Sequence, residues 1–72
     1  MNLAREIPQY PDVTVTLSEG QDGNAFMVIA AVSKAIRRAH GNEAANAFAR
    51  RAYDAGSYAE MLQLCMSTVN VE

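Results

Sequence analysis

The chain has 72 residues, a formal net charge of −2, one cysteine and one histidine. This length allows a single domain with a thin hydrophobic core, which often depends on a staple or on a partner. The lone cysteine, Cys65, excludes an internal disulfide, and with His40 as the only histidine the chain has too few ligands for a typical zinc site. We therefore expect no metal and no cofactor, and stability that comes from helix packing or from oligomerisation.

The hydropathy of the chain bears on its location. No stretch approaches the roughly 20 apolar residues of a membrane-spanning helix. The first residues also lack the apolar core of a signal peptide. We therefore expect a cytoplasmic protein that has no membrane among its partners.

The first predicted elements are a tail and a strand. Pro8 and Pro11 oppose both a helix and a central strand, so residues 1–12 are predicted to form a flexible tail. Residues 13–17 alternate apolar and β-branched polar side chains, which predicts a half-buried strand with its apolar side chains facing the core. Because a lone strand leaves its backbone groups unpaired, it has to pair with the C-terminal run 68–71 or with its copy in another subunit.

A long apolar helix is predicted next. Residues 20–24 indicate a tight turn that ends in a helix N-cap at Asn24. Residues 25–32 carry no polar side chain, which is typical of a helix covered on several sides. The helix is predicted to run to about His40, and Gly41 fits the position just after its end.

Two further helices complete the chain. Asn42 is a candidate N-cap for an alanine-rich second helix over about 43–55, which Gly56 would end. Residues 57–60 form a capping box that starts a third helix running to about Ser67. Its apolar face is predicted to consist of Met61, Leu62, Cys65 and Met66.

Together these elements predict one small α+β domain over residues 13–72. It has one N-terminal β-strand, then three α-helices, then a short extended C-terminus that pairs with the strand or with another subunit. The predicted core contains Val15, Leu17, Phe26, Ile29, Val32, Ile36, Phe48, Leu62, Cys65 and Val69.

The turn before the first helix is the first candidate site. A helix N-terminus offers free N–H groups and partial positive charge, so Gln21, Asp22, Gly23 and Asn24 could hold an anion or a nucleotide. The turn has neither the Lys-Ser/Thr of a P-loop nor the third glycine of a dinucleotide fingerprint, and Asp22 would repel a phosphate. The alternative is a turn and an N-cap with a folding role alone.

Basic residues form the second candidate site. The segment 34–51 carries a net charge of +4, from five basic residues and Glu43, whereas the rest of the chain carries −6. Its two arginine pairs, Arg37-Arg38 and Arg50-Arg51, flank one helix hairpin and could bind a nucleotide, a nucleic acid or an acidic partner. An alanine-rich second helix is a poor reader of bases, which disfavours specific DNA recognition. The alternative is solvated arginines that pair with Glu43, Asp54 and Glu60.

A catalytic constellation is not expected. The macrodipole explains a histidine at the end of a helix, and Cys65 within an apolar run is typical of a small buried hydrophobe. The acidic residues form no close pair of the kind that general acid–base catalysis uses. We therefore expect a protein that is not an enzyme.

Several motifs of the chain occur together in one group of proteins. They are Gly20-Gln21-Asp22-Gly23-Asn24-Ala25-Phe26, then Ala35-Ile36-Arg37-Arg38-Ala39, Phe48, Ala55-Gly56-Ser57-Tyr58, Leu62, Cys65-Met66 and Val69-Asn70-Val71-Glu72. In this combination the chain resembles a family of small uncharacterised proteins from bacterial and phage genomes. The resemblance covers residues 13–72 and implies those domain limits and a bacterial or phage source, hence the host cytoplasm if the chain is phage-encoded. It implies no activity.

Three functional hypotheses follow from the sequence. The first is a non-catalytic binding module that self-associates and acts by binding a host or other cellular protein, because the core is thin and a strand edge is unsatisfied. The second is a sponge-like protein that sequesters a small anionic nucleotide with residues 20–24 and the arginines. The third is weak nucleic-acid binding by the basic hairpin, which the acidic net charge disfavours.

Overall fold

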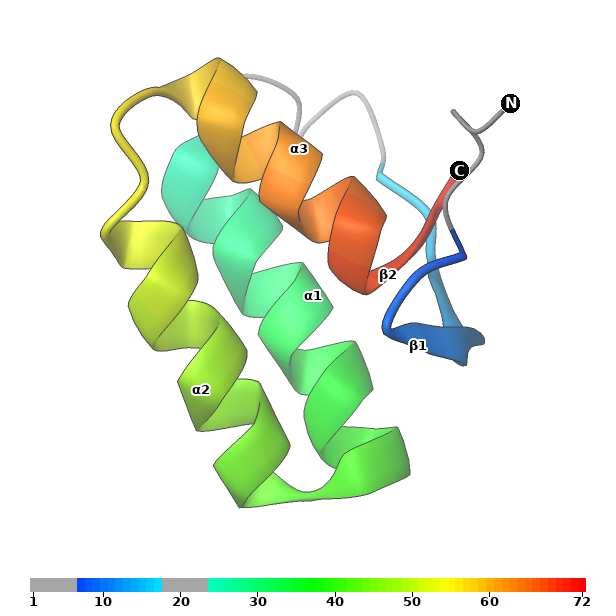
Figure 1. Ribbon diagram of the computed structural model, residues 1–72. Coiled ribbons are helices and arrows are strands. Elements are labelled where there is room, and N and C mark those ends of the chain that lie inside the picture. Colours follow the sequence, from blue (N-terminus) through cyan, green and yellow to red (C-terminus); the bar gives the residue numbers. More distant parts are fainter. Residues whose placement is uncertain (1–6, 18–23) are drawn as a thin grey trace.

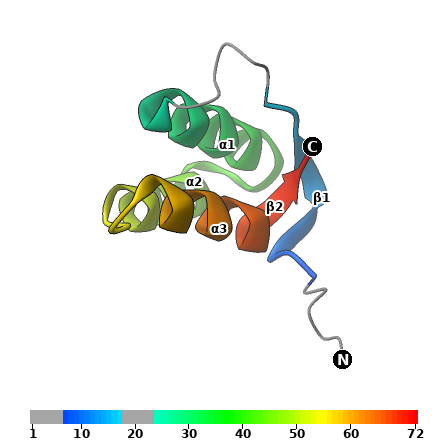
Figure 2. The ribbon, with the colours of Figure 1, turned by 90° about the horizontal axis from the view of Figure 1, so that it is seen from above.

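The computed structural model describes residues 7–17 and 24–72, and it has the predicted α+β order of elements (Figure 1). The elements are β1 (Tyr10–Val15), α1 (Ala25–His40), α2 (Asn42–Tyr53), α3 (Tyr58–Thr68) and β2 (Val69–Val71). Helices α1 and α2 form an antiparallel hairpin, and α3 packs against both of them. The two strands lie beside α1 and α3, on the side away from α2 (Figure 2).

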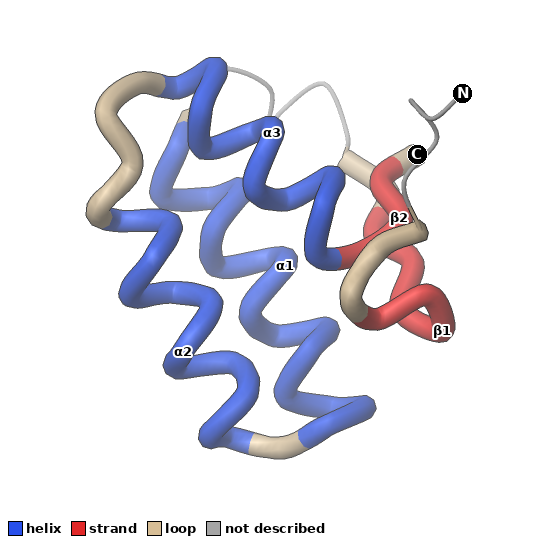
Figure 3. The backbone as a smooth tube through the Cα atoms, in the orientation of Figure 1, coloured by secondary structure: helices blue, strands red, loops and turns tan. Residues whose placement is uncertain are grey.

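The two strands pair in parallel within the chain, which settles the choice between an intramolecular and an intermolecular partner for β1. Thr14 faces Asn70 and Val15 faces Val71 in this register. The amide of Glu72 extends the ladder by donating to the Val15 carbonyl at 2.9 Å. Figure 3 shows the pair at the edge of the helical layer. The sheet therefore joins the two ends of the described chain.

Strand β1 begins at Tyr10, three residues before the predicted start, so the prediction of its limits was wrong. The pairing is irregular between Tyr10 and Thr14, and this interval contains Pro11. A proline has no N–H to donate and is tolerated in a strand at such irregularities. The carbonyl of Pro11 accepts a hydrogen bond from Nδ2 of Asn70 at 2.8 Å, which holds this part of β1 against β2.

The junction between α1 and α2 is a single residue, Gly41. The predicted start of α1 is confirmed, since Oδ1 of Asn24 accepts a hydrogen bond from the Met27 amide at 3.1 Å. Gly41 ends α1 with a φ of 96° and donates its N–H to the Arg37 carbonyl at 2.9 Å. Its own carbonyl starts α2 by accepting from the Ala45 amide. Asn42 is therefore the first residue of α2, and the prediction that it caps this helix was wrong.

The corner between α2 and α3 is held by Glu60. The Ser57 half of the predicted capping box is present, because Oγ of Ser57 accepts a hydrogen bond from the Glu60 amide at 3.1 Å. The Glu60 carboxylate reaches one residue beyond the usual box and accepts from the Gly56 amide at 2.9 Å. Helix α2 already ends at Tyr53, and Gly56 has no positive φ. The prediction of Gly56 as the stop of α2 was therefore wrong, because this residue belongs to the cap of α3.

The core lies where α1 meets the other elements. Of the predicted members, Val15, Ile29, Val32, Ile36, Phe48, Cys65 and Val69 are buried, and Leu17 and Leu62 pack partly buried against them. Phe26 is 70% exposed, so its assignment to the core was wrong, and Met66 is 55% exposed, so its place on the predicted apolar face of the third helix does not bury it. Small and sulfur-containing side chains fill much of the space instead. The additional buried residues are Val13, Val28, Ala45, Ala52 and Met61.

Candidate functional site

The predicted anion site is only partly described. Gln21, Asp22 and Gly23 lie outside the described residues. The Asn24 side chain is engaged as the cap of α1. Arg37 follows Asn24 by thirteen residues along α1, which places the two about 20 Å apart at a rise of 1.5 Å per residue. The structure therefore does not bring Arg37 or Arg38 to the N-terminus of α1.

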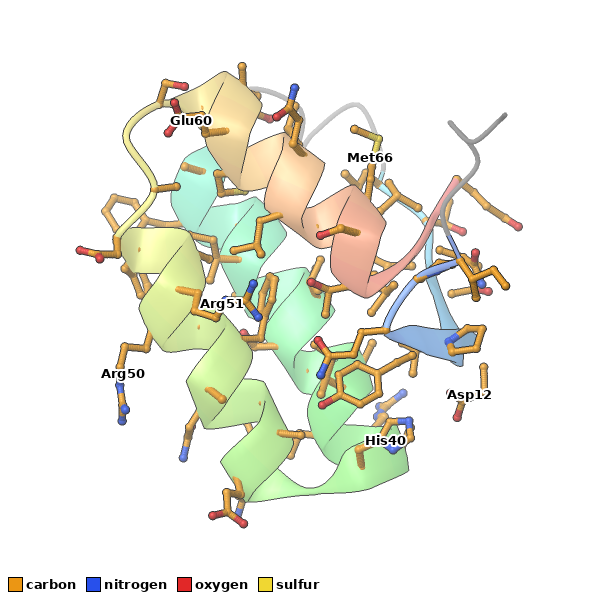
Figure 4. The ribbon with its side chains drawn as sticks, viewed as in Figure 1. Asp12, His40, Arg50, Arg51, Glu60 and Met66 are labelled. Carbon is orange, nitrogen blue, oxygen red and sulfur yellow. The ribbon has the colours of Figure 1, made fainter. Side chains whose placement is uncertain are left out.

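The four predicted arginines are exposed and spread over the hairpin. Arg37 and Arg38 lie in the last turn of α1, and Arg50 and Arg51 lie in the last turn of α2. Because the helices are antiparallel, the two pairs lie toward opposite ends of the hairpin. Figure 4 shows Arg50 and Arg51 leaving α2 in different directions.

The predicted ion pairs of the arginines do not form. Among the described residues, no salt bridge joins an arginine to Glu43, Asp54 or Glu60, and Glu60 bonds to the Gly56 amide instead. Exposed pairs of this kind contribute little stability, so the fold has no strong requirement for them. The charges of Arg50, Arg51 and Asp54 remain available at the surface of α2.

His40 has a partner that the sequence analysis missed. Its Nε2 lies 3.2 Å from each carboxylate oxygen of Asp12, and its ring lies 4.4 Å from the ring of Tyr10. The two labelled side chains lie at the C-terminal end of α1 (Figure 4). Asp12 is 62% exposed, and no cluster of three His, Cys, Asp or Glu residues able to hold a metal ion exists within ranges 7–17 and 24–72. The contact ties β1 to α1.

Cys65 is buried in α3, as predicted. Burial raises the pKa of its thiol to about 11, against an opposing effect of a backbone hydrogen bond. Its Sγ lies 3.6 Å from Sδ of Met61, one turn earlier in the same helix. A thiol that stays protonated at neutral pH is a poor nucleophile, so this side chain acts as part of the core.

The described residues form an apolar groove of about 210 Å³, which we call the Phe26–Tyr53 groove. Three helix ends meet there: the start of α1, the end of α2 and the start of α3. Its floor contains the buried side chains of Ile29, Ala52 and Met61. The remaining lining residues are Ala25, Phe26, Tyr53, Ala55, Ser57 and Tyr58.

Two exposed aromatic rings stand at the mouth of this groove. Phe26 and Tyr53 are 70% and 59% exposed, and their ring centroids lie 6.0 Å apart at an interplanar angle of 42°. This is the spacing of a tilted aromatic pair. Phe26 was predicted to lie in the core, so the groove was not predicted from the sequence. The only local signal was that both aromatic residues lie close to helix ends.

Charged residues of both signs adjoin the lining residues in the sequence, although none of them lines the groove. Arg50 and Arg51 precede Tyr53 within the last turn of α2, and Asp54 follows Tyr53 directly. Glu60 lies in the first turn of α3. These four side chains are exposed, and their charges sum to zero.

Comparison with known proteins adds no further constraint. Among the described residues, no helix combines the length and the apolar character that crossing a bilayer requires. No family model, no curated protein and no solved structure matches the chain. The resemblance to small bacterial and phage proteins therefore stays a prediction, and the functional argument depends on the geometry of the groove.

Proposed function

We propose that this chain is a small non-catalytic protein-binding module of bacterial or phage origin, which self-associates and acts by binding a cellular protein. The observation that supports this proposal is the Phe26–Tyr53 groove. Two large aromatic side chains more than half exposed beside an apolar hollow are costly to leave in water, and such exposed apolar patches mark interaction sites. Aromatic side chains are also enriched among the residues that dominate binding energy in protein interfaces.

The size and chemistry of the groove favour a protein ligand over a nucleotide. Its volume of about 210 Å³ lies below the range of about 300–1,000 Å³ that is typical of small-molecule sites. Of its nine lining residues, only Ser57 and the two tyrosines carry a polar side-chain atom, and none carries a charge. A phosphate group would find no cation in the lining. One or two apolar side chains of another protein chain fit both the volume and the polarity.

The alanines of the groove support the same conclusion. Ala25, Ala52 and Ala55 line the surface, and their short side chains let another backbone approach the helices closely. Seven of the nine lining residues belong to the three helices, and Ala55 and Ser57 lie in the short connection between α2 and α3. Sites on rigid elements hold their geometry without a partner, so little ordering is required on binding.

Quantitative affinity capture tests the proposal. The immobilised full chain is exposed to a lysate of a bacterial host, and captured proteins are identified and quantified by mass spectrometry beside native mass spectrometry of the chain itself. We expect self-association or a stoichiometric captured protein, and we expect Phe26→Ser with Tyr53→Ser to remove it. Met66→Ser, which alters an exposed apolar side chain on another face, is the matched control. A strict monomer that captures nothing would overturn the proposal.

A further inference from the structure

We infer that the exposed face of α1 binds an acidic segment of the partner protein. Carboxylates of that segment pair with Lys34, Arg37 and Arg38, and an apolar side chain beside them packs on Phe26 and Met27. This inference depends on the proposed function and states the chemistry of the partner, which the groove alone does not define.

The first argument is that six of the exposed residues of α1 form one continuous face. At 3.6 residues per turn they span about 120° of the helix circumference and about 18 Å of its length. The helix turns its other side to the core, with the buried residues Val28, Ile29, Val32, Ser33 and Ile36. We call the exposed side the outer face of α1, and it consists of Phe26, Met27, Ala30, Lys34, Arg37 and Arg38.

The second argument is that this outer face carries charge of one sign. Lys34, Arg37 and Arg38 lie in a helix that contains no acidic residue. Lys34 precedes Arg37 by three positions and Arg38 by four, which is the spacing at which like charges on a helix repel each other. The macrodipole favours cations in the last turn, which explains Arg37 and Arg38 but not Lys34, which lies one turn earlier. The fold thus accounts for only part of this charge, and an acidic ligand offsets the repulsion.

The third argument is that the chain does not neutralise the outer face itself. Among residues 7–17 and 24–72, no salt bridge joins Lys34, Arg37 or Arg38 to a carboxylate. Strand β1 brings Asp12 to the C-terminal end of α1, but this carboxylate contacts His40 instead. The three cations are exposed, so they are accessible to a ligand of opposite charge.

The fourth argument is the apolar end of the same face. Phe26 is 70% exposed and Met27 is 47% exposed, and both lie in the first turn of α1. A purely ionic ligand would leave these two side chains in water, whereas a protein segment carries apolar and acidic side chains together. Because Phe26 also lines the groove, the outer face is continuous with the surface that supports the proposed function.

The charge of the whole chain favours a protein segment over a nucleic acid. Even single nucleic-acid-binding modules bury about 600–1,000 Å² of protein surface, which is on the order of one sixth of the 4715 Å² of this chain. A duplex of that extent would meet repulsion from the remainder of the chain, which carries −6 outside residues 34–51. A short acidic segment needs only the outer face of α1.

Fluorescence anisotropy with a defined probe tests this inference. The probe is a labelled synthetic peptide with a leucine pair followed by a run of glutamates, and its control peptide has glutamines in place of the glutamates. We expect the full chain to bind the glutamate peptide more tightly, with an affinity that falls as the salt concentration rises. Equal binding of the two peptides, or no binding of either, would overturn the inference.

Paired substitutions of arginine locate the contact. Arg37→Gln with Arg38→Gln should raise the dissociation constant of the glutamate peptide by roughly tenfold. Arg50→Gln with Arg51→Gln removes the same charge from α2 and is the matched control, for which we expect roughly a twofold change or less. Circular dichroism checks that each variant keeps its helices. Equal losses in the two variants would show that the peptide responds to net charge alone, and would overturn the outer face as its site.

The remaining outcomes separate failure of this inference from failure of the proposed function. Tighter binding of duplex DNA, or of phosphatidylglycerol vesicles, than of the glutamate peptide would overturn the protein segment as the ligand of the outer face. A captured protein that Arg37→Gln with Arg38→Gln and high salt do not release, but that Phe26→Ser with Tyr53→Ser does, would overturn the acidic segment and leave the binding module standing. A chain that neither self-associates nor captures a protein would overturn both.

Discussion

Asp12 and His40 are 28 positions apart in the sequence, yet the His40 Nε2 lies 3.2 Å from both carboxylate oxygens of Asp12. The contact holds the N-terminal strand against the end of α1, and Tyr10 packs on the same imidazole ring. Because Asp12 is 62% exposed, we expect the interaction to contribute little: about 0.2–1 kcal/mol. A double-mutant cycle of Asp12→Ala and His40→Ala in urea measures it. A coupling energy of zero would show that the pair positions β1 without stabilising it.

Cys65 should make the stability of the fold depend on pH in the alkaline range. Its thiol pKa is raised from 9.0 to about 11 because burial disfavours the thiolate. The folded state therefore binds the thiol proton more tightly than the unfolded state does. The resulting stability is fully present below pH 9 and is lost as the pH rises toward about 11.

Denaturant unfolding at several pH values measures this dependence, with Cys65→Ala as the comparison. The free energy of unfolding of the native chain should fall more steeply between pH 9 and pH 11 than that of the variant, because only the native chain carries this thiol. Alkylation by iodoacetamide at neutral pH should be slow in the folded chain and fast in denaturant. Rapid alkylation of the folded chain would contradict the burial of this thiol.

The two glycines of the helix junctions should respond differently to alanine. Gly41 has a φ of 96°, where a side chain is strained although nothing lies within 4 Å of an added Cβ. Gly41→Ala should therefore lower the free energy of unfolding by about 1–2 kcal/mol through backbone strain. At Gly56 an added Cβ would approach Oε1 of Glu60 at 2.9 Å, the end of a flexible side chain. We expect a smaller loss there, and equal losses in chemical denaturation would refute the explanation by backbone strain.

Substitutions of Phe26 and Phe48 should distinguish a residue that serves binding from a residue that serves folding. Phe48 is 3% exposed in the core, so Phe48→Ala should cost about 3–5 kcal/mol, a large part of the stability of a small domain. Phe26 is exposed, so Phe26→Ala should change the stability of the monomer by about 0.5 kcal/mol or less. Thermal unfolding at dilute concentration compares the two variants. A large loss of thermal stability for Phe26→Ala would show that this ring is part of the folding core.

Removing the hydroxyl group of Ser33 should stabilise the folded chain. It is 6% exposed in α1, and its hydroxyl has no hydrogen-bond partner in the described part of the chain. A buried hydroxyl without a partner pays a desolvation cost, and alanine is the better helix former. Ser33→Ala should therefore raise the free energy of unfolding, by about 1 kcal/mol. Ser33→Thr, which keeps the hydroxyl, is the comparison, and a destabilised Ser33→Ala would mean that the hydroxyl is bonded in solution.

Several features that depend on neighbouring residues were predictable from the sequence, although the Asn42 cap and the Gly56 stop were predicted wrongly. The Asn24 cap, the end of α1 at Gly41 and the Ser57–Glu60 cap are each set within one helical turn, and all three are present. The pattern of apolar residues also predicted most of the core. Residues 25–32 were the exception, because an all-apolar run carries no polar residue to mark its exposed side, and Phe26 was assigned to the interior.

Features that join distant residues were not predictable in this way. The Asp12–His40 contact and the groove between three helix ends exist only once the elements have packed. The early start of β1 depends on its parallel partner, which accommodates Pro11 in an irregular pairing. Such contacts leave no periodic trace in the sequence, so propensity and spacing could not reveal them.

The strand pair can form only after almost the whole chain has been synthesised, because β1 is the first element and β2 is the last. β1 leaves the ribosome before the helices, whereas its partner β2 does not exist until residue 71 has been made. For that interval β1 exposes unpaired backbone groups, and the closure between them spans almost the whole domain, which makes it a late folding event. The missing N–H of Pro11 weakens any premature pairing with a strand of another nascent chain.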